Sequence, residues 1–232
     1  MSNYDISVII RVKNERRWIG YCIQSIIDNF QNPEIIIVDN NSDDETLSLI
    51  KNFEKNTDSG DRVDNNNKKY ADIKIVNIDD YSPGKALNLG VKKSSAKNIL
   101  ILSAHCEIQK VNLTEIKKKL KKYKSVFGNQ IPIWNGKKID KIFLWSHFID
   151  KENVNMFSKL ENRYFLHNAA AFYEKKILKR FPFDEKVSGK EDRFWAKKIV
   201  EKKMSYLYLP KFVVKHHYTV KGNSWKYIST RY

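Results

Sequence analysis

Short apolar runs alternate along the first half of the chain with segments whose apolar residues recur at helical spacing. The runs at 6–10, 35–38 and 73–78 are β-branched and apolar, as in buried strands. Between the first two runs, apolar residues within 19–30 stand three and four positions apart, which predicts an amphipathic helix. A fourth strand-like run follows at 99–102. The alternation predicts an α/β fold with a parallel sheet and helices on both of its faces.

The second half of the chain has a mixed pattern. It predicts helices, short strands and an irregular aromatic stretch: a helix around 113–123, strand-like residues at 125–127, aromatic residues from 134 to 165, helices near Tyr173 and after Gly189, and a strand at 206–209. The polar segment 56–69 predicts an exposed insertion. No linker is long enough to separate the two halves, so we expect a single domain.

Polar side chains follow each of the predicted parallel strands. The first strand leads into 11–15 (RVKNE), the second into 39–43 (DNNSD) and the fourth into 103–107 (SAHCE). Ligands in open α/β sheets bind beyond the carboxyl ends of the strands. The sequence therefore predicts a binding site at this edge of the sheet.

The chain is basic, with 43 Lys and Arg against 27 Asp and Glu among its 232 residues and a net charge of +16. The lysines are scattered along helices, as in 116–122, which favours a solvated face over a phosphate-binding surface. Nucleic acid is therefore the less favoured partner. A third interpretation is attraction to anionic phospholipid at a membrane surface, at about 1 kcal/mol per Lys or Arg.

Two cysteines, Cys22 and Cys106, provide neither a disulfide framework nor zinc-type spacing. Cys22 falls on the apolar face of the first helix and is expected in the core. The first strand begins almost at the N-terminus, and no apolar run approaches the roughly 20 residues that span a bilayer. We therefore expect a cytoplasmic protein, either free or at the cytoplasmic face of the membrane.

A series of motifs in order resembles the family 2 glycosyltransferases of the GT-A fold. The motifs are 11–15, 39–43, 84–90 (GKALNLG), the strand ending at Ser103, 183–185 (FDE) and Glu191-Asp192. The resemblance runs from Ile6 to about His217. It implies a GT-A (Rossmann-like), mostly parallel sheet flanked by helices. It also implies a nucleotide-sugar-binding half over 1–107, an acceptor-binding and catalytic half over 108–218, and a tail over 219–232 that could act as a lid.

The resemblance assigns donor binding to the strand ends and one helix start. The implied residues are Arg11, Asn14, Glu15, Asp39, Lys85, Ser103 and His105. Asp39 could accept the imide N–H of a uracil or thymine ring, and the competing interpretation is ordinary turn chemistry. Lys85 at a helix start could contact a diphosphate, or could simply face solvent.

The chain departs from the family pattern at the end of the fourth strand. The family places Asp-x-Asp there to hold a divalent metal on the donor diphosphate, whereas this chain has Ser103-Ala104-His105. Three interpretations stay open. His105 could ligate a metal, with Mn²⁺ suiting imidazole better than Mg²⁺; it could bind the diphosphate directly; or the site could be inactive.

The pair Glu191-Asp192 provides the candidate catalytic residue. In the family, an Asp in this position is the general base that takes the proton of the acceptor hydroxyl, and an ionised carboxylate suits that role. The alternative is that both acids only complement a helix dipole. The resemblance implies that Asp192 is the base and that Glu191 positions substrate. Further expected residues are Asn168 and Trp195 for the acceptor, and His216, His217 and Trp225 for a lid or phosphate contact.

We therefore expect an inverting glycosyltransferase (EC 2.4) that moves a sugar from a nucleotide-diphosphate donor to a glycan or lipid-linked glycan, with surface polysaccharide assembly as its setting. The expected cofactor is Mn²⁺ or Mg²⁺. The alternatives are a nucleotidyltransferase, disfavoured because 11–17 lacks glycine, and a binding module without turnover. A nucleic-acid-binding protein is the third, motivated by charge alone.

Overall fold

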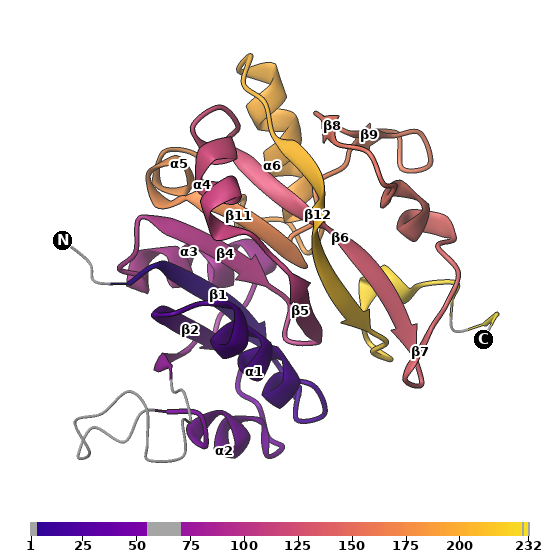
Figure 1. Ribbon diagram of the computed structural model, residues 1–232. Coiled ribbons are helices and arrows are strands. Elements are labelled where there is room, and N and C mark those ends of the chain that lie inside the picture. Colours follow the sequence, from indigo (N-terminus) through magenta and orange to yellow (C-terminus); the bar gives the residue numbers. More distant parts are fainter. Residues whose placement is uncertain (1–3, 55–70, 229, 232) are drawn as a thin grey trace.

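One mixed β-sheet runs through the molecule (Figure 1), which is described by a computed structural model over residues 4–54, 71–228 and 230–231. The expected insertion at 56–69 lies outside these described residues. The strand order is β3 (Asp72–Asn77), β2 (Pro33–Asp39), β1 (Ile6–Val12), β4 (Asn98–Leu102), β11 (Ala170–Glu174), β6 (Ser125–Trp134), β12 (Leu207–His217) and β5 (Cys106–Lys110). Short strands β7 (Lys137–Lys138) and β8 (Asn153–Val154) pair with β6 and β12, and β9 (Phe157–Ser158) pairs with β10 (Arg163–Tyr164).

The first four strands pair in parallel, as the sequence predicts. β11 is antiparallel to both β4 and β6 and joins the two halves of the sheet. The helix expected near Tyr173 is present but begins two residues later, at Lys175, because Tyr173 itself lies inside β11 opposite Ile99. The expected α/β class, a mostly parallel sheet with helices on both faces, is confirmed.

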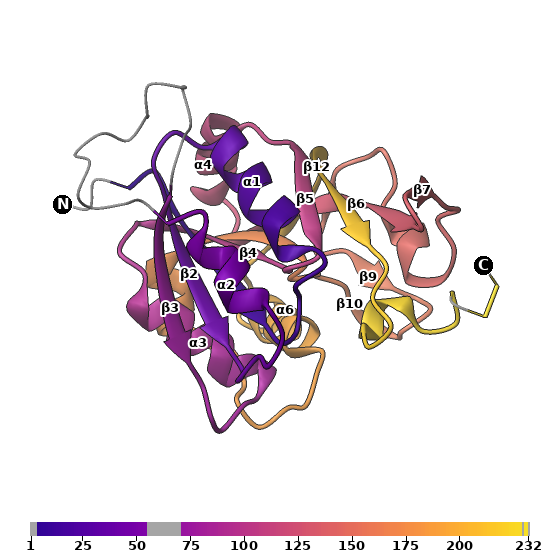
Figure 2. The same ribbon diagram turned by 90° about the horizontal axis from the view of Figure 1, so that it is seen from below.

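Helices cover both faces of the sheet. One face carries α1 (Ile19–Asn29), α2 (Thr46–Lys51) and α4 (Leu113–Leu120), and the other carries α3 (Pro83–Lys93), α5 (Lys175–Arg180) and α6 (Glu191–Glu201). Figure 2 shows α1 and α4 on the side of the sheet opposite α3 and α6. Short 3₁₀ helices lie at Phe143–His147 and Asn223–Trp225.

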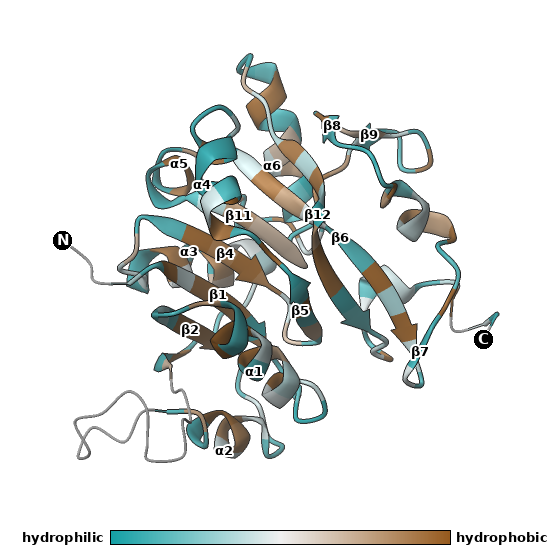
Figure 3. Ribbon diagram, in the orientation of Figure 1, coloured by the Kyte–Doolittle hydropathy of each residue, from teal (hydrophilic) through white to brown (hydrophobic). Residues whose placement is uncertain are grey.

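Alternate side chains of the central strands enter two separate cores. Val8 and Ile10 of β1 pack with α1, whereas Ile9 between them packs with α3, because successive side chains of a strand point to opposite faces. The strands β1, β2 and β4 are therefore almost wholly apolar (Figure 3). Cys22 is fully buried in the α1 core, as expected.

The sequence motifs 84–90 and 183–185 contact each other and hold α3 against the chain that precedes α6. A Cβ on Gly84 would lie 2.1 Å from the carbonyl oxygen of Asp184, so only glycine permits this approach. Asn88 donates to the carbonyl of Phe183 at 3.0 Å and to Glu185 Oε1 at 2.8 Å. The motif 84–90 therefore fixes the turn that leads into the start of α6.

Candidate functional site

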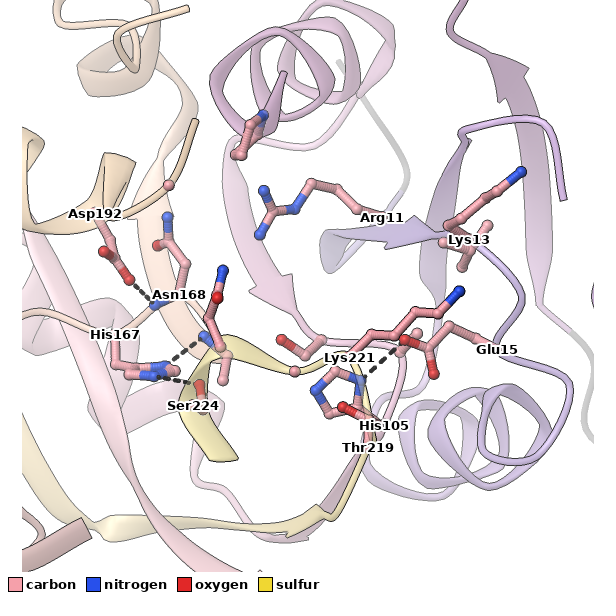
Figure 4. Close-up of a pocket in the computed structure, with 18 of the residues that line it drawn as sticks. Arg11, Lys13, Glu15, His105, His167, Asn168, Asp192, Thr219, Lys221 and Ser224 are labelled. Carbon is pink, nitrogen blue, oxygen red and sulfur yellow. Dashed lines mark hydrogen bonds and ion pairs between the residues drawn. The ribbon is translucent and has the colours of Figure 1, made fainter. Parts of the chain in front are cut away.

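A cavity of about 630 Å³ opens at the carboxyl ends of β1 and β4. Its walls come from the chain after β1, the end of β4, residues 167–169, the start of α6 and the segment 218–224 that follows β12. Figure 4 shows these side chains around one open space. The cavity, called the pocket below, lies at the edge of the sheet that the polar strand ends predict.

The end of β1 is tied to the turn after β2 by side-chain hydrogen bonds. Asn14 adopts a left-handed conformation (φ 55°), and its amide donates to Asp43 Oδ1 at 2.6 Å while accepting from the Asp43 backbone N–H at 3.0 Å. The backbone N–H of Glu15 donates to Thr46 Oγ1 at 2.8 Å. Asn14 and Glu15 are thereby held at the mouth of the pocket.

His105 and Glu15 contact each other across the pocket floor. His105 Nδ1 lies 3.1 Å from Glu15 Oε1, and both side chains keep a little exposure, 17% and 18%. The loop that carries His105 is fixed by backbone hydrogen bonds, from Ser103 N–H to the Ala169 carbonyl and from His217 N–H to the His105 carbonyl. The other ring nitrogen of His105, Nε2, takes no part in this contact with Glu15.

An ion pair joins the two halves of the chain inside the pocket. Arg11 Nη2, from β1, lies 3.2 Å from Glu191 Oε1, from the first turn of α6. Burial raises the pKa of Glu191 above its ordinary value, and Arg11 offsets only part of this effect. Burial opposes the charge on Arg11, but Glu191 and Tyr81 raise its pKa, so it stays a cation.

Asp192 is held by donors on both of its oxygens. Oδ2 accepts from the Asn168 backbone N–H and from Arg193 Nη1, each at 2.9 Å, and Oδ1 accepts from the Arg193 backbone N–H at 2.8 Å. A carboxylate offers about four lone-pair directions. Three are used, so one on Oδ1 is left to accept a proton or a hydrogen bond from a molecule in the pocket.

The neighbours His167 and Asn168 complete this wall. Burial lowers the pKa of His167 well below its ordinary value, so the ring is neutral at neutral pH. Its Nδ1 accepts from the Ala169 N–H at 3.2 Å, so Nε2–H donates to Ser224 Oγ at 3.1 Å. Asn168 Oδ1 accepts from the Tyr173 hydroxyl at 2.6 Å, while its buried Nδ2 has no partner in the described part of the chain.

The pocket lining contains most of the residues that the sequence predicts for the site. It brings together Arg11, Asn14, Glu15, Ser103, His105, Asn168, Glu191 and Asp192. Asp39 is not among the lining residues. Its carboxylate is buried and accepts from Ser42 Oγ at 2.6 Å and from the Ser42 N–H at 3.1 Å, as in ordinary turn chemistry. Its role toward a nucleotide base stays a prediction.

Two other expected site residues lie away from the pocket. Lys85 Nζ pairs with Asp80 at the surface and is not among the lining residues, so its contact with a diphosphate stays a prediction. Trp195 is buried in the α3 core, where its ring packs against Tyr173 and its Nε1–H donates to the Phe181 carbonyl at 2.8 Å. Trp195 is not among the residues that line the pocket, and its role toward an acceptor stays a prediction without support from this position.

The residues expected to form a lid are structural supports. His216 is buried and its Nδ1–H donates to Gln130 Oε1 at 2.8 Å, while His217 bonds Glu107 and stacks on Trp18. Trp225 is buried against Trp145, with ring centroids 4.9 Å apart. None of the three is among the residues that line the pocket, and their lid and phosphate roles stay predictions without support from these positions. Trp225 instead anchors the segment 218–224, which does line it.

Several charged residues of the pocket were not predicted from the sequence, among them Glu161, Arg193 and Lys221. Glu161 and Arg193 form an ion pair at 3.1 Å, and Lys221 reaches into the pocket from the C-terminal segment (Figure 4). Arg193 adjoins Asp192 in sequence, which is a signal that could have found it. Glu161 and Lys221 lie in irregular segments whose position depends on the tertiary fold.

The comparisons with known proteins agree with this geometry. The model of the family described as "Glycosyl transferase family 2" matches residues 7–181. The chain belongs to this family. The resemblance that the sequence motifs carry is thus confirmed.

A curated relative from Campylobacter jejuni subsp. jejuni serotype O:2 (strain ATCC 700819 / NCTC 11168) is named GalNAc(5)-diNAcBac-PP-undecaprenol beta-1,3-glucosyltransferase. It is 26% identical over 207 residues, which cover 85% of this chain and 60% of the relative. The crystal structure of S. aureus TarS 1-349 in complex with UDP-GlcNAc is similar at a TM-score of 0.69 and 17% identity, over 95% of this chain and 60% of TarS 1-349. The UDP complex gives a TM-score of 0.65 at 17% identity, over 92% of this chain and 60% of that one.

The chain thus spans about 60% of the length of these relatives. The structural similarity supports the expected GT-A-like fold. None of the helices in the described ranges is long and apolar enough to cross a membrane.

The residues at the end of β4 do not fit a protein metal site. Within the described ranges, no group of three or more His, Cys, Asp and Glu side chains is placed to hold a metal ion. His105 offers one free ring nitrogen, and Glu15 beside it is engaged with the same ring. A divalent cation in a protein takes four to eight ligands, so this pair does not by itself build a complete site, and a cation here would need the donor diphosphate and water for its other ligands.

Proposed function

We propose that the protein is an inverting glycosyltransferase that moves a sugar from a nucleotide-diphosphate donor to a glycan or lipid-linked glycan acceptor. The observation that carries the proposal is the shared pocket, where strand-end residues meet Asp192 at the start of α6. Family membership supports the reaction class. The name of the C. jejuni relative includes an undecaprenol-linked glycan, which supports a lipid-linked acceptor, and the TarS complex supports a nucleotide-sugar donor.

In the proposed reaction the donor lies along the ends of β1 and β4, beside Arg11 and His105. Asp192 accepts the proton of the acceptor hydroxyl on the free position of Oδ1 as the oxygen attacks the anomeric carbon. The bond to the nucleoside diphosphate breaks in the same step, and a single displacement inverts the anomeric configuration. Cationic side chains stabilise the negative charge that develops on the leaving group.

The neighbours of Asp192 fix the geometry of this base. The Asn168 N–H and Arg193 hold its Oδ2, which leaves Oδ1 facing the acceptor. Glu191, paired with Arg11, links the base to the donor side of the pocket. We place the protein in surface polysaccharide assembly in the cytoplasm, at the membrane face where a lipid-linked acceptor would be presented. The large positive charge suits such a surface.

A thermal-shift screen with UDP, dTDP, GDP and CMP tests the donor assignment, because a ligand that binds the folded state raises the apparent stability. The proposal expects one of the nucleoside diphosphates to raise the melting temperature, and the matching nucleotide sugars to release that diphosphate during turnover with acceptor. If none of the nucleotides shifts the melting temperature at millimolar concentration, the donor assignment fails. Binding without turnover on any acceptor would instead favour a binding module.

A further inference from the structure

Every acidic side chain in the described pocket lining already has a cationic or imidazole partner. The pairs are Glu15 with His105, Glu161 with Arg193 and Lys190, Glu191 with Arg11, and Asp192 with Arg193. The positive partner beside each carboxylate offsets its charge and repels a second cation. The lining therefore does not present the oxygen ligands that Mg²⁺ and Mn²⁺ favour.

The same lining has an excess of cations. It contains Arg11, Lys13, Arg17, Lys190, Arg193 and Lys221 against four acids. Arg17 lies over the ring of Trp18, and Lys13 donates to the Asn41 carbonyl. Lys221 lines the pocket, where Figure 4 draws it with the other labelled side chains, and it has no ion pair within the described ranges. It is thus a cation available to an anionic ligand at the end of β4.

The backbone segment that carries Lys221 is anchored before and after this residue. Before it, the Tyr218 N–H donates to the Ile133 carbonyl at 2.8 Å; after it, Ser224 bonds His167 and the ring of Trp225 is buried against Trp145. Arg11 stands on the opposite side of the same space, on the rigid end of β1 (Figure 4). Two cations on separate, anchored elements are suited to hold a diphosphate between them.

We propose that Lys221 and Arg11 bind the diphosphate of the donor directly, in place of the divalent metal that an Asp-x-Asp motif would hold. This inference rests on the proposed function, since it takes a nucleotide sugar as the ligand. The ammonium and guanidinium groups stay with the nucleoside diphosphate as the sugar departs and neutralise the charge that it gains. The substitution of Ser103-Ala104-His105 for the acidic motif then leaves a functional site that needs no metal.

Calorimetric titration of the full chain with UDP, dTDP and GDP, in EDTA and again in Mn²⁺ or Mg²⁺, tests the inference. We expect at least one nucleotide to bind about equally tightly in EDTA and in metal. The variant Lys221→Gln should weaken that binding in EDTA by about tenfold, because one charge-assisted hydrogen bond to phosphate is lost. The matched control is Lys226→Gln, an exposed lysine just beyond the segment 218–224 and outside the pocket, which should bind as the unaltered protein does.

The outcomes separate this inference from the proposed function. Nucleotide binding that appears only with Mn²⁺ or Mg²⁺ overturns the inference and leaves the glycosyltransferase standing. Equal binding by Lys221→Gln and the unaltered protein in EDTA also overturns it. Absence of binding by all three nucleotides in both buffers overturns the inference together with the proposed function.

Discussion

The variant Asp192→Asn tests the assignment of the base most sharply, because it removes the charge and nearly preserves the shape. The oxygen of the amide can still accept from the Asn168 N–H and Arg193 Nη1. Its NH₂ group then takes the place of Oδ1 and cannot accept from the Arg193 backbone N–H. One charge-assisted hydrogen bond is lost, at about 1.5–3 kcal/mol. For a chain of this size that lowers the melting temperature by about 3–12 °C.

Asp192→Asn should lower turnover far more than it lowers the stability of the fold. Loss of a general base lowers turnover by about 10²- to 10⁴-fold. The assay follows release of nucleoside diphosphate in the presence of acceptor, well below the melting temperature, with nucleotide affinity measured in parallel. Nucleotide affinity should stay nearly unchanged, because Asp192 takes no part in holding the donor.

Two variants serve as comparisons. Asp184→Asn alters an exposed acid outside the pocket and should retain turnover. Glu191→Gln keeps an oxygen for Arg11 and should lower turnover less than Asp192→Asn does. Full turnover by Asp192→Asn would remove Asp192 as the base. If Glu191→Gln alone abolished turnover, the base would be Glu191.

Three further predictions concern stability. Gly84→Ala should lower the free energy of unfolding in a urea titration by about 3 kcal/mol or more, because the added Cβ meets the Asp184 carbonyl. A decrease of less than about 1 kcal/mol would show that the turn can shift to make room for the methyl group. Trp225→Ala should lower the free energy of unfolding by about 3–5 kcal/mol and weaken nucleotide binding, because the ring anchors the segment 218–224. Unchanged nucleotide affinity would contradict the link between this ring and the pocket. Burial lowers the pKa of His167 and of His216 well below that of an unfolded histidine, so both rings fold neutral. The stabilisation of the folded state by these neutral rings is present above about pH 6.5 and is lost as the pH falls, at about 1.4 kcal/mol per pH unit for each ring. A free energy of unfolding that stays constant from about pH 7 to about pH 5 would contradict this.

The parallel half of the fold could be predicted because its signals are local. The runs 6–10, 35–38 and 99–102 are too apolar and too short for anything but buried strands. β11 could not be predicted in the same way. Its sequence, Ala170–Glu174, is rich in alanine and suits a helix equally well, and only pairing with β4 and β6 decides for a strand.

The residues of the site show the same difference between positions set by local sequence and positions set by tertiary packing. Polar residues that directly follow a strand, such as Glu15 and His105, could be placed because the end of a strand fixes their position. The outcome for Lys85 and Trp195 could not be foreseen, since helix rotation and tertiary packing decide whether a side chain faces the pocket. Lys221 depends on a segment whose course is set by the distant contacts of Trp225.

The central claim, that a sugar nucleotide occupies the pocket, is tested most directly by hydrogen exchange of the full chain with and without the nucleoside diphosphate that binds best. We predict slower exchange in peptides that cover 11–18, 103–107 and 218–225, the three parts of the lining that surround the proposed donor. Peptides that cover α4 should exchange at the same rate in both conditions. Protection confined to regions outside the pocket, with these three peptides unchanged, would contradict the account.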